Sequence, residues 1–200
     1  NHAQLEAGRM NANAKTLWAP QAWINGAWAS NVLLNIDDQG LWSSITTDTP
    51  APAHAQVLNA PMLPGIVNAH SHAFQRAFAG MAECREADAD DFWSWRQQMY
   101  GVALQITPEG MYATAKQLYT ELKLGGYTHT CEFHYLHHQP SGTPYPNPLE
   151  MSLALVQAAV DCGMGLTLLP VLYERAGFTQ PALRDDQRRF ATDVNAVLTL

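Results

Sequence analysis

The stretch Leu63-Pro-Gly-Ile-Val-Asn-Ala-His-Ser-His72 decides the fold. Its Pro-Gly pair turns the chain into a short apolar run, which predicts a buried β-strand that ends in two histidines. Because alternate residues of a strand point to the same side, the imidazoles of His70 and His72 can face one point. Neutral imidazole suits zinc or iron, so the pair predicts half of a metal site. A His-x-His tripeptide alone is a weak motif, and the strand that leads into it gives it weight.

From Met62 onward the chain alternates between strand and helix signals. Strands joined by helices indicate parallel pairing, and the strand over Gly165–Leu172, which has little polar alternation, is expected to be buried on both faces. Thr107 followed by Pro108 is typical of a helix start, and Gly125-Gly126 of a helix end. The other expected elements are helices over Phe92–Leu104, from the cap Asn147 to Gly163 and over Arg189–Leu200, and strands over Tyr127–His134 and Gly165–Leu172.

Polar residues gather directly after each of these strands. An open doubly wound sheet and a closed barrel both accommodate three such strands. A (β/α)₈ barrel carries its active site at the C-terminal ends of its strands, which is where these polar residues fall. We therefore predict an α/β fold that is the N-terminal part of a TIM barrel. Eight strand–helix units need roughly 250 residues, so we expect the barrel to be truncated at the C-terminus of this chain. The polar residues are His70, His72, His134, Tyr135, Tyr173 and Glu174.

A different pattern precedes the barrel. Short segments with Trp, Val and Ile are separated by turn residues, which predicts a small β-rich unit before Met62. Asn25-Gly26 and Asp38-Gln39-Gly40 are typical of hairpin turns. The run Pro50-Ala-Pro52 interrupts the unit before the first barrel strand.

Composition excludes several classes of protein. With 200 residues, of which 47% are hydrophobic, the chain can bury a core, so general disorder is excluded. The net charge is -7 and the cations are scattered, so we expect no nucleic-acid partner. No apolar run reaches the length of a membrane span, so no membrane partner is expected. The three cysteines lie far apart, which argues against a disulfide framework and favours a cytoplasmic protein.

The strand at residues 64–72 resembles the first barrel strand of the amidohydrolase superfamily. A closer resemblance, over residues 17–190, is to the formimidoylglutamate deiminases of that superfamily. It implies an amidohydrolase-type (β/α)₈ TIM barrel over residues 62–200, a small β-sandwich part over residues 17–61 and an N-terminal extension over residues 1–16. Four segments carry the resemblance, and they are His70–Gly80, Asp91–Tyr100, Glu132–His138 and Gly165–Tyr173.

The resemblance also implies an activity. Hydrolysis of the linear amidine N-formimidoyl-L-glutamate would give N-formyl-L-glutamate and ammonia in histidine degradation, with a metal-activated water as the nucleophile. His70 and His72 would be the first ligands of one divalent ion, zinc or alternatively iron. In the family the other ligands and the catalytic acid–base residues come from later strands, so no catalytic residue is assigned within these 200 residues. The expected partner is a small-molecule dicarboxylate substrate, and we expect the full-length protein to be a homodimer.

Three residues match substrate-binding positions of the family. Arg96, in the segment Phe-Trp-Ser-Trp-Arg, offers a planar guanidinium that can bind a carboxylate with two hydrogen bonds. Gln75 and Tyr135 can each donate a hydrogen bond to a carboxylate. Arg76 competes with Arg96 for the cationic role, and the residues themselves do not decide between the two.

Other polar residues near the strand ends are interpreted as structural. His137 and His138 fall in a loop, where fixed ligand geometry is hard to maintain, while His134 could line the pocket. Glu132 is predicted to be an interior residue with a polar partner, because burying a carboxylate is costly unless it is hydrogen-bonded.

Two alternatives stay open at this point. A relative in the same superfamily could deaminate a heterocycle such as guanine, cytosine or a methylthiopurine. The chain could also belong to a non-catalytic barrel module that keeps the strand motif without a complete site.

Replacement of Arg96 separates these hypotheses. Under the deiminase hypothesis, Arg96→Ala in the full-length protein removes the cation that binds a substrate carboxylate, and we expect a loss of about 2–5 kcal/mol in transition-state binding. The measurement is kcat/KM for formimidoylglutamate. A variant with nearly unchanged kcat/KM would contradict the assignment and favour a heterocycle pocket.

Overall fold

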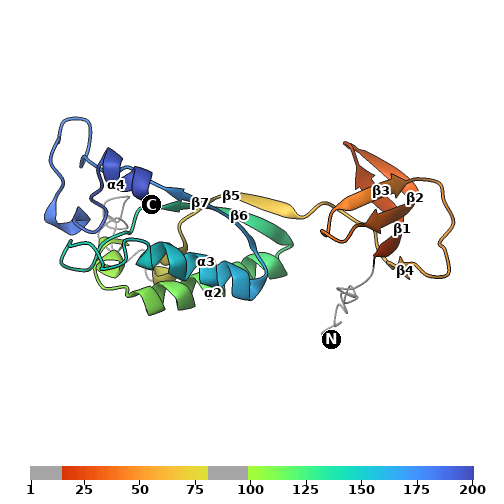
Figure 1. Cartoon of the computed structure of the whole chain (residues 1–200), viewed down its shortest axis with the longest axis horizontal. Helices are drawn as coiled ribbons and strands as arrows, with labels where there is room; N and C mark the ends of the chain where they lie inside the picture. Colours follow the sequence, from red (N-terminus) through yellow and green to blue (C-terminus); the bar gives the residue numbers. More distant parts are fainter. Residues whose placement is uncertain (1–14, 81–98) are drawn as a thin grey trace, which may run out of the picture. The chain divides into compact units, whose positions relative to one another are not determined.

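The computed structural model describes residues 15–80 and 99–200 of the chain. The chain divides into two compact units, Asn1–Pro64 and Gly65–Leu200, each of which contains one β-sheet (Figure 1). Within the described ranges, no helix combines the length and the apolar character needed to cross a membrane.

The first unit is a four-stranded sheet with the order β3-β2-β1-β4. Its central hairpin turns at Asn25-Gly26, as the sequence predicts. Both turn residues have a positive φ, 49° and 85°, which a two-residue hairpin turn of this kind requires. The unit has a small core whose buried residues are Leu17, Ala22, Val32 and Leu34. The strands are β1 (Thr16–Ile24), β2 (Ala27–Ile36), β3 (Trp42–Thr46) and β4 (Gln56–Val57).

The second unit begins with a parallel sheet in the order β5-β6-β7. A helix follows each of the first two strands, so that consecutive strands are joined through α2 and α3 (Figure 1). The two helices pack against each other. In addition, α2 contacts β6 and α3 contacts β7. This is the repeating strand–helix order of the opening part of a (β/α)₈ barrel. The elements are β5 (Ile66–Ser71), α2 (Pro108–Leu124), β6 (Tyr127–His134), α3 (Glu150–Cys162) and β7 (Gly165–Pro170).

Steric contact with β6 explains the glycine of the Pro-Gly pair that precedes β5. A Cβ atom built on Gly65 would lie 2.2 Å from side-chain atoms of Thr128, which belongs to the adjacent strand β6. A larger residue at position 65 would therefore require the Thr128 side chain or one of the two strands to shift.

The predicted ends of α2 are confirmed, whereas the start of α3 is wrong. The Thr107 side chain accepts a hydrogen bond from the backbone N–H of Gly110 at 3.1 Å, and the helix ends at Gly125. Asn147 does not cap α3. Its side chain accepts from the N–H of Leu149 at 3.1 Å and so closes a turn before the helix, which begins only at Glu150.

Two further expectations about the second unit need correction, and a third is tested only in part. The strand over Gly165–Leu172 is not buried on both faces, because Leu169 of β7 is 42% exposed; Ile66 and Val67 of β5 are likewise 51% and 54% exposed. The last helix, α4, covers only Val194–Thr199, and residues 189–193 of the predicted helix are not helical. Most of the predicted helix over Phe92–Leu104 lies outside the described residues, although residues 99–103 are helical.

Arg189 explains why the chain before α4 is not helical. Its side chain is fully buried and donates hydrogen bonds to three backbone carbonyls, those of Ala103, Ile106 and His138. A fourth hydrogen bond reaches the hydroxyl of Tyr145 at 3.3 Å. The guanidinium thus joins three separate segments, and the backbone at Arg189 follows these contacts rather than its helical propensity.

We expect Arg189→Ala to destabilise the full-length protein by about 3 kcal/mol or more, because it leaves several buried carbonyls without a donor. Arg188→Ala is the matched control, since its ion pair with Asp185 lies at the surface and should contribute less than ~1 kcal/mol. Denaturant unfolding measures both changes. Equal losses for the two variants would contradict the structural role of Arg189.

Candidate functional site

The two histidines of the opening stretch meet at the end of β5. Their Nε2 atoms lie 2.9 Å apart, and their rings are nearly perpendicular. His70 is exposed and His72 is partly buried. The structure therefore brings both imidazoles to one point, as their alternation along the strand predicts.

A backbone carbonyl of β6 orients the ring of His72. Nδ1 of His72 lies 2.9 Å from the carbonyl oxygen of Phe133, so Nδ1 carries the hydrogen and Nε2 presents a lone pair toward His70. Burial lowers the pKa of His72, and the neighbouring His70 lowers it further, while the Phe133 carbonyl opposes the shift. The neutral ring in this tautomer is the form that ligates a metal ion.

The donor set fits a divalent metal ion. Two zinc–nitrogen bonds of ~2.05 Å place their nitrogens ~2.9 Å apart at a right angle and ~3.3 Å apart at the tetrahedral angle. The same separation also suits a hydrogen bond between the two rings. In residues 15–80 and 99–200, no group of three or more His, Cys, Asp or Glu side chains could hold a metal ion, so an ion bound by the pair would need further ligands from outside these ranges.

Gln75 and Tyr135 lie beside the histidine pair. Gln75 belongs to the short 3₁₀ helix η1 (Ala73–Phe78) that follows His72, and its Nε2 donates to the Tyr135 hydroxyl at 3.1 Å. The ring of Tyr135 lies 5.1 Å from that of His72. Burial raises the pKa of the Tyr135 hydroxyl, which therefore remains a hydrogen-bond donor at neutral pH. Gln75 and Tyr135, two of the three residues that the family resemblance assigns to substrate binding, are thus neighbours of the histidine pair.

The two candidate arginines are in different situations. Arg96 lies outside the described residues. Arg76 forms two hydrogen bonds of 2.9 and 2.8 Å with the carboxylate of Glu121 on α2. The Arg76 guanidinium, with Gln117 as a second partner, lowers the pKa of Glu121 to about 2. Arg76 is therefore committed to a surface ion pair with α2.

His134 of β6 and His137 of the loop that follows are buried, and His138 is partly buried. The rings of His134 and His137 are 4.6 Å apart, and burial lowers the pKa of both, that of His137 to about 4. Nε2 of His134 and both ring nitrogens of His137 have no hydrogen-bond partner among the described residues. Neutral rings in an apolar setting agree with the structural interpretation.

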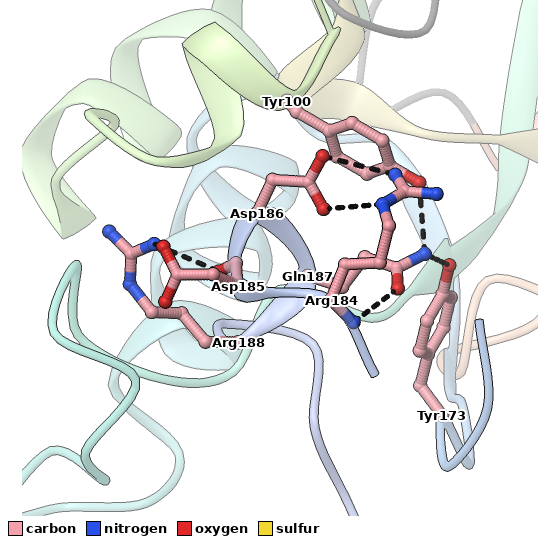
Figure 2. A network of polar contacts seen from close by, with 7 residues as sticks. All are labelled: Tyr100, Tyr173, Arg184, Asp185, Asp186, Gln187 and Arg188. Atoms are coloured by element: carbon pink, nitrogen blue, oxygen red, sulfur yellow. Dashed lines mark hydrogen bonds and ion pairs between the residues drawn. The ribbon is translucent and has the colours of Figure 1, made fainter. Parts of the chain in front are cut away.

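An aromatic group behind Tyr135 was not predicted from the sequence. The Tyr135 ring stacks on Tyr173, with centroids 6.1 Å apart and an interplanar angle of 28°. The buried amide of Gln187 donates to the hydroxyls of Tyr173 and Tyr100, at 3.1 Å each (Figure 2). The position of Tyr173 after the third strand was a signal for it, whereas Gln187 carries no sequence signal.

Figure 2 also shows how the segment around Gln187 is fixed. Arg184 forms two hydrogen bonds of 3.0 Å with Asp186, and its guanidinium lies 5.1 Å from the centre of the Tyr100 ring. The backbone N–H of Arg184 donates to the side-chain oxygen of Gln187 at 3.1 Å. The amide that orients the two tyrosines is therefore held at both of its ends.

Comparisons with known proteins give one family model and two similar proteins. Residues 62–197 match the model of the amidohydrolase family. The chain is 44% identical over 184 residues to formimidoylglutamate deiminase from Pseudomonas aeruginosa, which is 92% of this chain and 40% of that protein. It is 32% identical over 108 residues to 8-oxoguanine deaminase from the same organism, which is 52% of this chain and 21% of that protein.

A solved structure shows the same fold. The crystal structure of an amidohydrolase from Brucella melitensis matches 90% of this chain with a TM-score of 0.84 and 44% sequence identity, and the match covers 40% of that protein. The chain thus spans about 40% of the length of the relatives that it matches over nearly its whole extent.

We expect His72→Ala in the full-length protein to weaken zinc binding by more than the ~10- to 100-fold that changes in outer-shell partners typically cause. His138→Ala is the control, because His138 is assigned no role in the site, and its zinc affinity should remain unchanged. Competition with a chromogenic chelator measures both dissociation constants. Equal loss of affinity in the two variants would refute the assignment of His72 as a ligand.

Proposed function

The chain belongs to the amidohydrolase family, and from this premise we propose that its protein hydrolyses N-formimidoyl-L-glutamate to N-formyl-L-glutamate and ammonia in histidine degradation. The observation that carries the proposal is the contact between Gln75 and Tyr135 beside the two histidines. Gln75 and Tyr135 are hydrogen-bond donors that suit a carboxylate, and they lie next to two imidazoles that could ligate a metal ion. The identity to a formimidoylglutamate deiminase supports the same substrate.

His70 and His72 would hold the metal ion. When bound, zinc supplies Lewis-acid activation of water at neutral pH, which is the chemistry that hydrolysis of an amidine needs. The Phe133 carbonyl keeps Nε2 of His72 unprotonated and directed toward the shared point. Iron remains the second candidate because imidazole ligands suit both metals.

Gln75 and Tyr135 would bind a substrate carboxylate. Because Gln75 donates to the oxygen of the Tyr135 hydroxyl, the hydroxyl hydrogen is directed away from Gln75. In this structure it points toward the sulfur of Met99, 3.6 Å from the hydroxyl oxygen. Thioether sulfur is a weak acceptor, so a carboxylate that took its place would gain a stronger hydrogen bond. Arg96 would supply the positive charge.

Deamination of a heterocycle is the second candidate. The similarity to 8-oxoguanine deaminase favours it. This similarity is lower in identity and covers less of the chain than the similarity to the deiminase.

Ammonia release by the full-length protein tests the proposal. We expect release from formimidoylglutamate that is lost after chelation and restored by added zinc, and little release from guanine or 8-oxoguanine. The assay couples ammonia to a dehydrogenase that oxidises a nicotinamide cofactor. Release from a purine but not from formimidoylglutamate would overturn the substrate assignment in favour of the second candidate.

A further inference from the structure

Glu132 of β6 is a buried carboxylate next to the metal-ligand pair. Its side chain is 2% exposed, and Oε1 accepts a hydrogen bond from the backbone N–H of Ala73 at 2.5 Å. Tyr119 of α2 makes a longer contact of 3.5 Å with Oε2. Ala73 directly follows His72, so the carboxylate is hydrogen-bonded to the peptide group that joins a proposed metal ligand to the next residue.

The backbone N–H of Ala73 needs a hydrogen-bond acceptor from outside β5 and the 3₁₀ helix that follows it. The regular pairing of β5 with β6 shifts in register between Asn68 and Ser71, and β5 ends at Ser71. His72 has φ -134° and ψ 85° and precedes the 3₁₀ helix, in which the first N–H groups have no acceptor within the helix. The Glu132 carboxylate satisfies the first of these groups, which belongs to Ala73.

Three residues at or just after the end of β6 form hydrogen bonds with the chain at His72, Ala73 and Gln75. The Glu132 side chain binds the backbone that follows His72, the Phe133 carbonyl binds the His72 ring, and the Tyr135 hydroxyl binds Gln75. Because Glu132 and Phe133 are neighbours in one strand, the backbone and the ring of His72 are fixed relative to each other.

We propose that Glu132 is a positioning residue for the metal ligand His72, whose imidazole it directs toward the metal by holding the Ala73 backbone. The inference rests on the proposed function only in that it takes His72 to be a ligand. An uncharged acceptor of the same shape can form the hydrogen bond to Ala73, so the role depends on geometry and not on the charge of the carboxylate. Burial raises the pKa of Glu132, whereas the hydrogen bonds from Ala73, Ser71 and Tyr119 oppose that rise.

The alternative is that Glu132 only stabilises the fold. Removal of a buried acceptor leaves the Ala73 N–H unsatisfied and lowers stability in either case. The two roles differ in what happens to metal affinity when the protein is folded. A merely structural residue changes the melting temperature and leaves the metal affinity of the folded protein unchanged.

The experiment compares zinc dissociation constants and melting temperatures of four full-length proteins: the wild type, Glu132→Ala, Glu132→Gln and Leu155→Ala. Leu155 is a fully buried residue of α3 with no assigned role in the site, so its truncation is a control for loss of stability. Zinc binding is measured by chelator competition at a temperature at which all four proteins are folded. Hydrolysis of formimidoylglutamate is measured in parallel.

We expect Glu132→Ala to weaken zinc binding about 10-fold or more, in the range that outer-shell changes produce. Glu132→Gln should restore the affinity to within about threefold of the wild type, and Leu155→Ala should melt at a lower temperature with wild-type zinc affinity. Wild-type zinc affinity in Glu132→Ala would overturn the proposal, and so would equal losses in the Ala and Gln variants. Normal zinc binding by the wild type without hydrolysis of formimidoylglutamate would overturn the proposed substrate and leave the role of Glu132 intact.

Discussion

The parallel pairing of β5 with β6 holds the candidate site together. His70 and His72 lie at the end of β5, and the groups that orient the second ring come from the facing end of β6. A peptide carbonyl makes a rigid acceptor, because its position is set by the strand to which it belongs. The geometry of the imidazole pair therefore depends on the register of two strands rather than on the flexible parts of the chain.

Residues from the second half of the chain support this arrangement from behind. The ring of Tyr135 makes an edge-to-face contact with the ring of His72 and also packs against Tyr173 and Phe190. Gln187 connects Tyr173 with Tyr100 through one amide group. A segment with little regular structure can hold these rings in place because its polar groups are paired inside the protein, as the buried amide of Gln187 shows.

The secondary structure was predictable where the signal is local. The turn at Asn25-Gly26, the start of α2 at Thr107 and the extent of β6 all follow from neighbouring residues. The start of α3 was not predictable in this way. The side chain of Asn147 can either cap a helix or accept a hydrogen bond within a turn, and in the structure it forms the turn. The segment that contains Arg189 was also misjudged, since its buried hydrogen bonds to distant carbonyls outweigh local helix propensity.

By itself, the sequence determined that two histidines leave a strand on the same side, because the alternation of side chains is a property of the strand alone. It also determined the alternation of strands and helices that leads to a barrel. Only the tertiary structure decided which group orients His72, which acceptor holds Ala73 and that Arg76 pairs with Glu121. Each of these partners lies 45 to 61 positions away, and such contacts depend on strand register and helix packing, which no local pattern specifies.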